Sequence, residues 1–143
     1  MTPLTTHRCE GDTLNNGLAI GVIDNPGPGG GHSEYQISIA DAVPNIHQPR
    51  ERARFSRTLT NLRFQNMPVQ DAGGINGISN EALLAIVEHR LSCFQQGDYK
   101  CAENEAALAG IRSALEAMRQ RTARRVDEGV EGTLQKDAIQ PAS

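Results

Sequence analysis

SNEALLAIVEHRLSCFQQG, residues 79–97, is the stretch of sequence that decides the fold. Ser79 stands just before the apolar run and has the side chain typical of a helix N-cap. The apolar residues that follow at steps of four, four and three are Leu83, Val87, Leu91 and Phe94. This spacing predicts a helix with one apolar stripe. Gly97 and Asp98 are expected to end that helix and to cap the next one.

A second helix is predicted after this turn, because an apolar stripe appears again at steps of three, four and three. Its members are Leu108, Ile111, Leu115 and Met118. Gly129 and Gly132 are expected to end it. Such heptad-like spacing suits an antiparallel helical hairpin or helix packing between chains. We therefore expect a long helical hairpin over residues 79–128.

The N-terminal half has the pattern of short strands. An apolar run at 18–24, the period-2 alternation at 35–39 and a third stretch marked by Leu62, Phe64 and Asn66 predict three strands of a small antiparallel sheet. The glycine run at 27–31 lacks the Lys-Ser/Thr pair of a P-loop, which favours a tight hairpin connection. Residues 41–60 are expected to form a mobile loop. The fold class is thus α+β, a small antiparallel β-sheet followed by a long antiparallel helical hairpin.

The ends of the chain are predicted to lie outside the domain. Residues 1–16 are polar and are expected to form a disordered leader, and residues 134–143 a tail. Residues 17–133 then form a single domain, of which 17–70 is the β part. The longest apolar run, Leu83 to Val87, is too short to span a bilayer, so we expect neither a membrane segment nor a signal peptide.

Composition favours self-association and argues against general polyanion binding. Of 143 residues only 3% are aromatic, so a lone chain has little to bury. The formal net charge is −3, with 14 basic and 17 acidic residues. Cys93 and Cys101 are expected to be buried small apolar groups, and the three cysteines predict no disulfide framework. The scattered histidines and cysteines predict no metal site and no cofactor.

The end of the second predicted helix is rich in arginine. Its basic residues are Arg112, Arg119, Arg121, Arg124 and Arg125, and the single acidic residue among them is Glu116. Arg125 lies seven residues after Met118 and so continues the apolar stripe, with Arg121 four residues earlier on the same side. Two guanidinium groups beside an apolar seam could clamp a pyrophosphate. Arginines near a helix C-terminus also complement the dipole and solvate the surface, and both interpretations stay open.

Several segments resemble the phage anti-Thoeris sponge family (Thoeris anti-defence protein one), whose helical hairpin is shared with phage anti-CBASS cyclic-oligonucleotide sponges. The most specific are Phe94-Gln95-Gln96-Gly97, Cys101, Glu103-Asn104, Arg121-Thr122, Arg125 and Gly129-Val130-Glu131-Gly132-Thr133. Looser likenesses are Gly29-Gly30-Gly31-His32, Phe64-Gln65-Asn66, Asn76-Gly77 and Asn80 to Val87. The resemblance covers about residues 18–133, without the 41–60 insert. Asp98, Met67 and Leu134 depart from the family pattern.

The resemblance implies a non-enzymatic sponge in the cytoplasm of the infected bacterial host. It would sequester cyclic ADP-ribose isomers made by bacterial TIR-domain enzymes. By resemblance, Phe94 stacks on adenine, Asn104 bonds the base edge or ribose, and Arg121 and Arg125 meet the phosphates. Some relatives form hexamers (trimers of dimers) and bind cyclic trinucleotides at a second site, for which the 73–80 loop is a candidate here.

Helix geometry adds a constraint to these four residues. Asn104 and Arg121 are 17 residues apart on one predicted helix, which separates them by roughly 25 Å at about 1.5 Å per residue. One chain therefore cannot offer both to one small nucleotide. An antiparallel second copy can, which predicts two shared sites per homodimer.

Two other classes of function compete with the sponge. An enzyme that hydrolyses or isomerises the signal would need a carboxylate pair or a metal set, and the sequence offers neither. The alternative is a small helical nucleic-acid or protein interaction module that uses the Arg-rich helix end. Against DNA binding stand the acidic net charge and the absence of a recognition-helix pattern.

Overall fold

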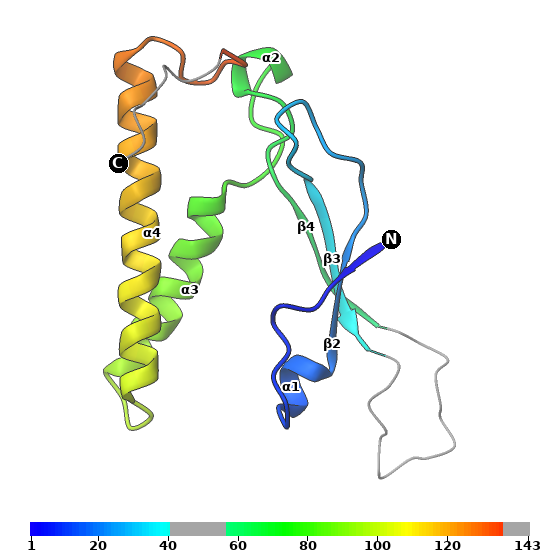
Figure 1. Ribbon diagram of the computed structural model, residues 1–143, viewed down its shortest axis with the longest axis vertical. Helices are drawn as coiled ribbons and strands as arrows, with labels where there is room; N and C mark the ends of the chain where they lie inside the picture. Colours follow the sequence, from blue (N-terminus) through cyan, green and yellow to red (C-terminus); the bar gives the residue numbers. More distant parts are fainter. Residues whose placement is uncertain (41–56, 136–143) are drawn as a thin grey trace. The chain divides into compact units, whose positions relative to one another are not determined.

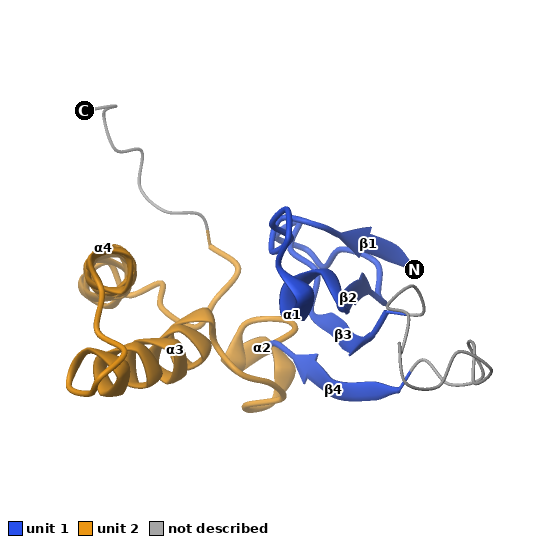
Figure 2. Ribbon diagram, turned by 90° about the horizontal axis from the view of Figure 1, so that it is seen from below, with its two compact units in different colours: residues 1–64 blue, residues 65–143 orange. Residues whose placement is uncertain are grey.

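The computed structural model describes residues 1–40 and 57–135. They fall into two compact units, divided between Phe64 and Gln65, where the sequence predicts a single domain over 17–133 (Figure 2). Most of the expected 41–60 loop and all but two residues of the expected 134–143 tail lie outside the described residues.

The first unit contains a four-stranded antiparallel sheet with strand order β1-β2-β3-β4 (Figure 2). Its strands are β1 (Thr2–Leu4), β2 (Leu18–Val22), β3 (Glu34–Ile39) and β4 (Thr58–Arg63). A short helix, α1 (Thr13–Asn16), precedes β2. The sheet is followed by two long helices, so the α+β prediction is confirmed.

Side-chain alternation gives the sheet one apolar face. Val22 on β2 pairs with Tyr35 on β3, which pairs with Leu62 on β4, and all three therefore point to the same side. Val22 is 8% exposed, and the rings of Tyr35 and Phe64 meet edge to face at 5.6 Å. The core of this unit lies on that face.

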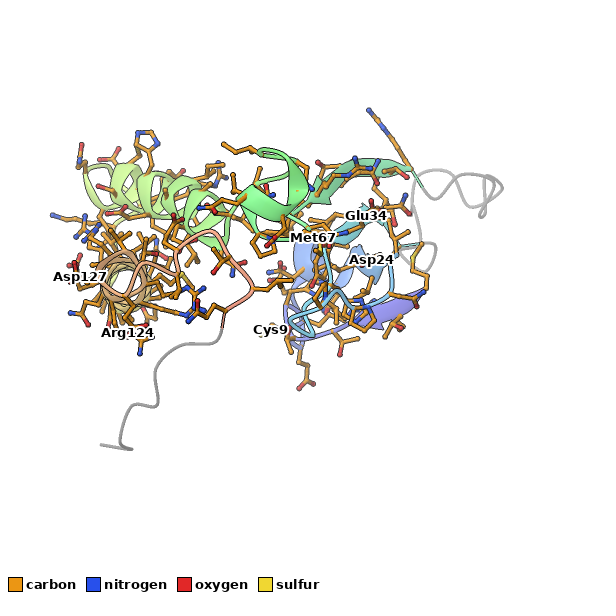
Figure 3. All side chains as sticks on the ribbon, turned by 90° about the horizontal axis from the view of Figure 1, so that it is seen from above. Cys9, Asp24, Glu34, Met67, Arg124 and Asp127 are labelled. Atoms are coloured by element: carbon orange, nitrogen blue, oxygen red, sulfur yellow. The ribbon has the colours of Figure 1, made fainter. Side chains whose placement is uncertain are left out.

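The glycine-rich run connects β2 to β3 as a hairpin, but the connection extends from Ile23 to Ser33 and is longer than the tight turn that the sequence predicts. Gly30 has a φ of 85°, a left-handed conformation that glycine adopts without strain. The Asp24 carboxylate accepts the backbone N–H of Ser33 at 2.8 Å, and Nδ1 of His32 lies 2.8 Å from the Asp24 carbonyl oxygen. These contacts hold the two ends of the connection together (Asp24 and Glu34 are labelled in Figure 3).

The structure corrects the prediction of a disordered leader over residues 1–16. Thr2 pairs with Val22 in the β1–β2 ladder, and the side chain of Asp12 caps α1. Nε2 of His7 lies 2.9 Å from the Leu18 carbonyl oxygen. Strand β1 lies at the edge of the sheet, where backbone pairing orders the chain without an apolar pattern. At the other edge, β4 begins at Thr58, four residues before the strand that the sequence predicts.

The second unit is built around the predicted helical hairpin. Its helices are α2 (Val69–Ala72), α3 (Asn80–Gln95) and α4 (Ala102–Asp127), of which α3 and α4 pack antiparallel (Figure 1). The Ser79 hydroxyl accepts the N–H of Ala82 at 3.0 Å, which confirms the predicted N-cap. Arg112 on α4 and Glu88 on α3 form an ion pair at 3.1 Å across the hairpin.

The hairpin buries little of its own apolar stripe. Leu108 of α4 is 3% exposed and Val130 is 4% exposed, but α3 has no buried residue. Two members of the α3 stripe, Val87 and Phe94, are 38% and 37% exposed. The stripe of α3 is therefore only partly covered within one chain.

Candidate functional site

One end of the hairpin carries Phe94 and Asn104. Phe94 lies in the last turn of α3 and is 37% exposed, and Asn104 lies in the first turn of α4 and is half-buried. The guanidinium carbon of Arg90, one turn before Phe94, lies 5.1 Å from the centre of its ring. This cation–π contact orients the ring while leaving part of it accessible.

The turn between the helices corrects two predictions. The N-cap of α4 is Cys101, whose Sγ accepts the N–H of Asn104 at 3.4 Å, whereas the sequence favours Asp98. Asp98 is wrong as a cap because α4 begins at Ala102, three residues later than a cap at Asp98 would require. Cys93 and Cys101 are exposed, where burial is predicted, because Cys101 lies in the turn and Cys93 faces outward beside His89.

The other end of α4 carries Arg121, Arg124 and Arg125. Arg124 and Asp127 are labelled at this end in Figure 3. Arg121 is exposed, whereas Arg125 is 8% exposed. The Arg125 guanidinium donates to the carbonyl oxygen of Val130 at 2.9 Å and to those of Thr133 and Gln135 at 3.1 Å. It therefore fastens the C-terminal turn, residues 128–135, to the helix.

The structure brings the four predicted site residues together in pairs, and not as one set. Helix α4 is continuous from Ala102 to Asp127, so Asn104 and Arg121 are held roughly 25 Å apart. Phe94 and Asn104 share the turn end of the hairpin, and Arg121 and Arg125 share the opposite end.

The arginine cluster is less positive than the sequence indicates. Arg112 pairs with Glu88, which lies on the other helix, and Arg119 pairs with Glu116. Sequence reasoning missed the first pair because residues 24 apart in the chain meet only through the hairpin. It also missed Gln95, which contacts Cys101 and Glu105 across the turn. Gln95 stands in the Phe-Gln-Gln-Gly run, whose polar residues before a turn glycine were the available signal.

His89 and Cys93 form an exposed pair, with Nε2 and Sγ 3.7 Å apart. Among residues 1–40 and 57–135, no group of three or more His, Cys, Asp or Glu side chains is placed to hold a metal ion. In the same ranges, no helix combines the length and the apolar character needed to cross a membrane.

Comparison with known proteins identifies the hairpin. The family described as Acb2/Tad1, hairpin domain, matches residues 60–123. This segment, just under half of the chain, is therefore similar to the Acb2/Tad1 hairpin. Thoeris anti-defense 1 of Bacillus phage SBSphiJ7 is 42% identical over 82 residues, which are 57% of this chain and 57% of the relative. The resemblance to the anti-Thoeris sponge family is thus confirmed.

The Acb2/Tad1 hairpin includes three of the four predicted site residues. Phe94, Asn104 and Arg121 fall within the matched residues 60–123, and Arg125 lies two positions beyond them. The match begins inside β4, so it spans the C-terminal part of the sheet unit as well as α2, α3 and most of α4.

Proposed function

We propose that this chain is a phage anti-defence sponge in the host cytoplasm. It binds cyclic ADP-ribose-type nucleotides made by bacterial TIR-domain enzymes and sequesters them without cleavage. The Acb2/Tad1 hairpin and the relative named Thoeris anti-defense 1 support the anti-defence role. The observation that carries the binding role is the pairing of an accessible ring and an amide at the turn end of the hairpin with guanidinium groups at its opposite end.

Each group suits one part of such a nucleotide. Phe94 offers a ring surface on which adenine can stack, an interaction worth about 1–3 kcal/mol. The Asn104 amide supplies the paired donor and acceptor that the adenine edge requires. Arg121 is exposed and supplies a planar fork for a phosphate. Arg125 stands beside it as the second proposed phosphate contact, with its guanidinium bonded to the C-terminal turn.

A complete site needs a second copy of the chain. Since α4 keeps Asn104 and Arg121 roughly 25 Å apart, an antiparallel partner must bring its arginines to the Phe94 end. The partly exposed stripe of α3, with Val87 38% exposed, supplies apolar surface for such a contact, and the adjacent Ile86, 65% exposed, adds to it. The protein is then a homodimer, or a hexamer made of three dimers, with two shared sites per dimer.

Calorimetry of the purified chain against cyclic ADP-ribose isomers, cyclic trinucleotides and duplex DNA tests the proposal. We expect one cyclic ADP-ribose bound per chain, and intact nucleotide released when the complex is heated. Released nucleotide that has been cleaved or isomerised would indicate an enzyme. Binding of duplex DNA alone, weakened by salt, would instead support the nucleic-acid module.

A mixing experiment tests whether the site is shared. Asn104→Ala and Arg121→Ala proteins each lack one half of every site, so neither binds on its own. After subunit exchange about half of the dimers are mixed, and each mixed dimer has one intact site, so about a quarter of all sites should recover near wild-type affinity. Arg119→Ala, a neighbouring exposed arginine paired with Glu116, is the matched control and should bind normally. Exchange without recovery would refute the shared site.

A further inference from the structure

The side chain of Gln95 spans the turn between α3 and α4. Its Nε2 donates to the Cys101 carbonyl oxygen at 3.1 Å and to Glu105 Oε2 at 3.0 Å. Its Oε1 accepts the Cys101 backbone N–H at 3.0 Å. One amide thus holds both backbone groups of Cys101 and also the first turn of α4.

This clip, the set of bonds between Gln95, Cys101 and Glu105, links the two residues proposed to meet the base. Gln95 directly follows Phe94 in α3. Cys101 caps α4, and its Sγ accepts the backbone N–H of Asn104 at 3.4 Å. The path from the ring to the Asn104 backbone therefore runs through the clip.

The turn has few other contacts to fix its shape. Gly97 donates its N–H to the Phe94 carbonyl oxygen at 3.1 Å, which closes the end of α3. Tyr99, in the middle of the turn, is 82% exposed. Packing therefore contributes little there, and the hydrogen bonds of Gln95 determine where α4 begins relative to Phe94.

We propose that Gln95 is a positioning residue for nucleotide binding, which holds the Asn104 amide at a fixed separation from the Phe94 ring. The role rests on the proposed function, because Phe94 and Asn104 are the groups that would meet the base. A pre-formed pair binds more tightly than a mobile one, because less conformational freedom is lost when the ligand binds. Gln95 itself need not touch the nucleotide.

Exchanging the Gln95 amide and the Glu105 carboxylate tests the clip, because one donates the hydrogen bond that the other accepts. In Gln95→Glu, a carboxylate faces Glu105 and the Cys101 carbonyl oxygen, so two of the three contacts become repulsive. In the double variant Gln95→Glu/Glu105→Gln, a glutamine amide again stands opposite a carboxylate. The Cys101 N–H still has its acceptor, and the contact with the Cys101 carbonyl oxygen is the single repulsive one that remains.

Calorimetry with cyclic ADP-ribose compares the wild type with these variants. Gln95→Ala should bind about 10-fold more weakly, Gln95→Glu more weakly still, and the double variant should return to within about 3-fold of wild type. Gln96→Ala, the adjacent exposed glutamine, is the matched control and should bind as wild type does. The Cys101 amide proton, followed by hydrogen exchange without ligand, should exchange faster in Gln95→Ala.

The outcomes separate this role from the sponge itself. A wild-type chain that binds no cyclic ADP-ribose overturns the proposed function and this role with it. A wild-type chain that binds, together with a Gln95→Ala chain of equal affinity, overturns the positioning role alone. Should Gln95→Ala lose its fold, the double variant decides: recovery supports the role, and binding as weak as in Gln95→Glu overturns it.

Discussion

Replacing Arg125 with alanine tests whether the main role of this residue is to stabilise the fold. The guanidinium is 8% exposed and bonds the carbonyl oxygens of Val130, Thr133 and Gln135. Hydrogen bonds from charged groups contribute about 1.5–3 kcal/mol each. In the variant, water can donate to the carbonyl oxygen of the exposed Gln135 in place of the lost guanidinium. It can hardly reach the carbonyl oxygen of Val130, which is 4% exposed. We therefore expect the variant to lose about 3 kcal/mol of unfolding free energy.

That loss corresponds to a fall of about 10 °C in Tm for a chain of this size. Thermal unfolding followed by circular dichroism measures it without ligand. Arg121→Ala is the matched comparison, because Arg121 lies one turn earlier and is exposed, and its Tm should change by less than about 2 °C. Arg125→Lys should stay destabilised, since an ammonium lacks the fork that reaches several carbonyls. An Arg125→Ala chain that melts as wild type does would refute this reasoning and leave phosphate contact as the residue's role.

Three further predictions concern the ring, the assembly and the sheet. Phe94→Ala should weaken cyclic ADP-ribose binding by about 1–3 kcal/mol in calorimetry, with Tyr99→Ala, in the same turn, as a control that binds normally. Light scattering should give twice 15.5 kDa or a multiple of it, and a mass of one chain throughout a dilution series would contradict the dimer. Burial raises the pKa of Asp24, but backbone N–H bonds from Ser33 and Glu34 outweigh it and leave the pKa below 3.8. Asp24 therefore stabilises the fold above pH 3.8 and loses this contribution as the pH falls through its lowered pKa. Urea unfolding should show a smaller loss at low pH in Asp24→Asn, and an equal loss would contradict the assignment.

The helices could be predicted because their determinants are local. The stripe spacing and the Ser79 cap indicate α3 without knowledge of any other element. Strand β3 was predictable for the same reason, since its residues alternate in polarity. Strand β1 was not, because three residues cannot carry a pattern and its pairing with β2 forms across the chain. The start of β4 was missed because Thr58, Leu59 and Thr60 are exposed on an edge strand.

The residue types of the candidate site come from the sequence and stay predictions, whereas the contacts around them come from the structure. The resemblance supplied Phe94, Asn104, Arg121 and Arg125. Helix geometry alone separated the two ends of α4. The clip at Gln95 was missed because its partners lie six and ten residues further along, beyond the turn. The cap at Cys101 was missed because a thiol is a weak acceptor and is not among the usual N-cap residues.

The burial of Arg125 follows from its position in the apolar pattern of the sequence. Seven residues after Met118, it continues the apolar stripe of α4, and a stripe position faces the interior. A guanidinium placed there must find acceptors, because an unpaired buried charge is strongly unfavourable. The nearest acceptors are backbone carbonyls of the residues that follow the helix, and Gly129, with a φ of 71°, turns the chain back toward them. The stripe thus explains the burial of Arg125, and burial explains why its first partners are carbonyl oxygens.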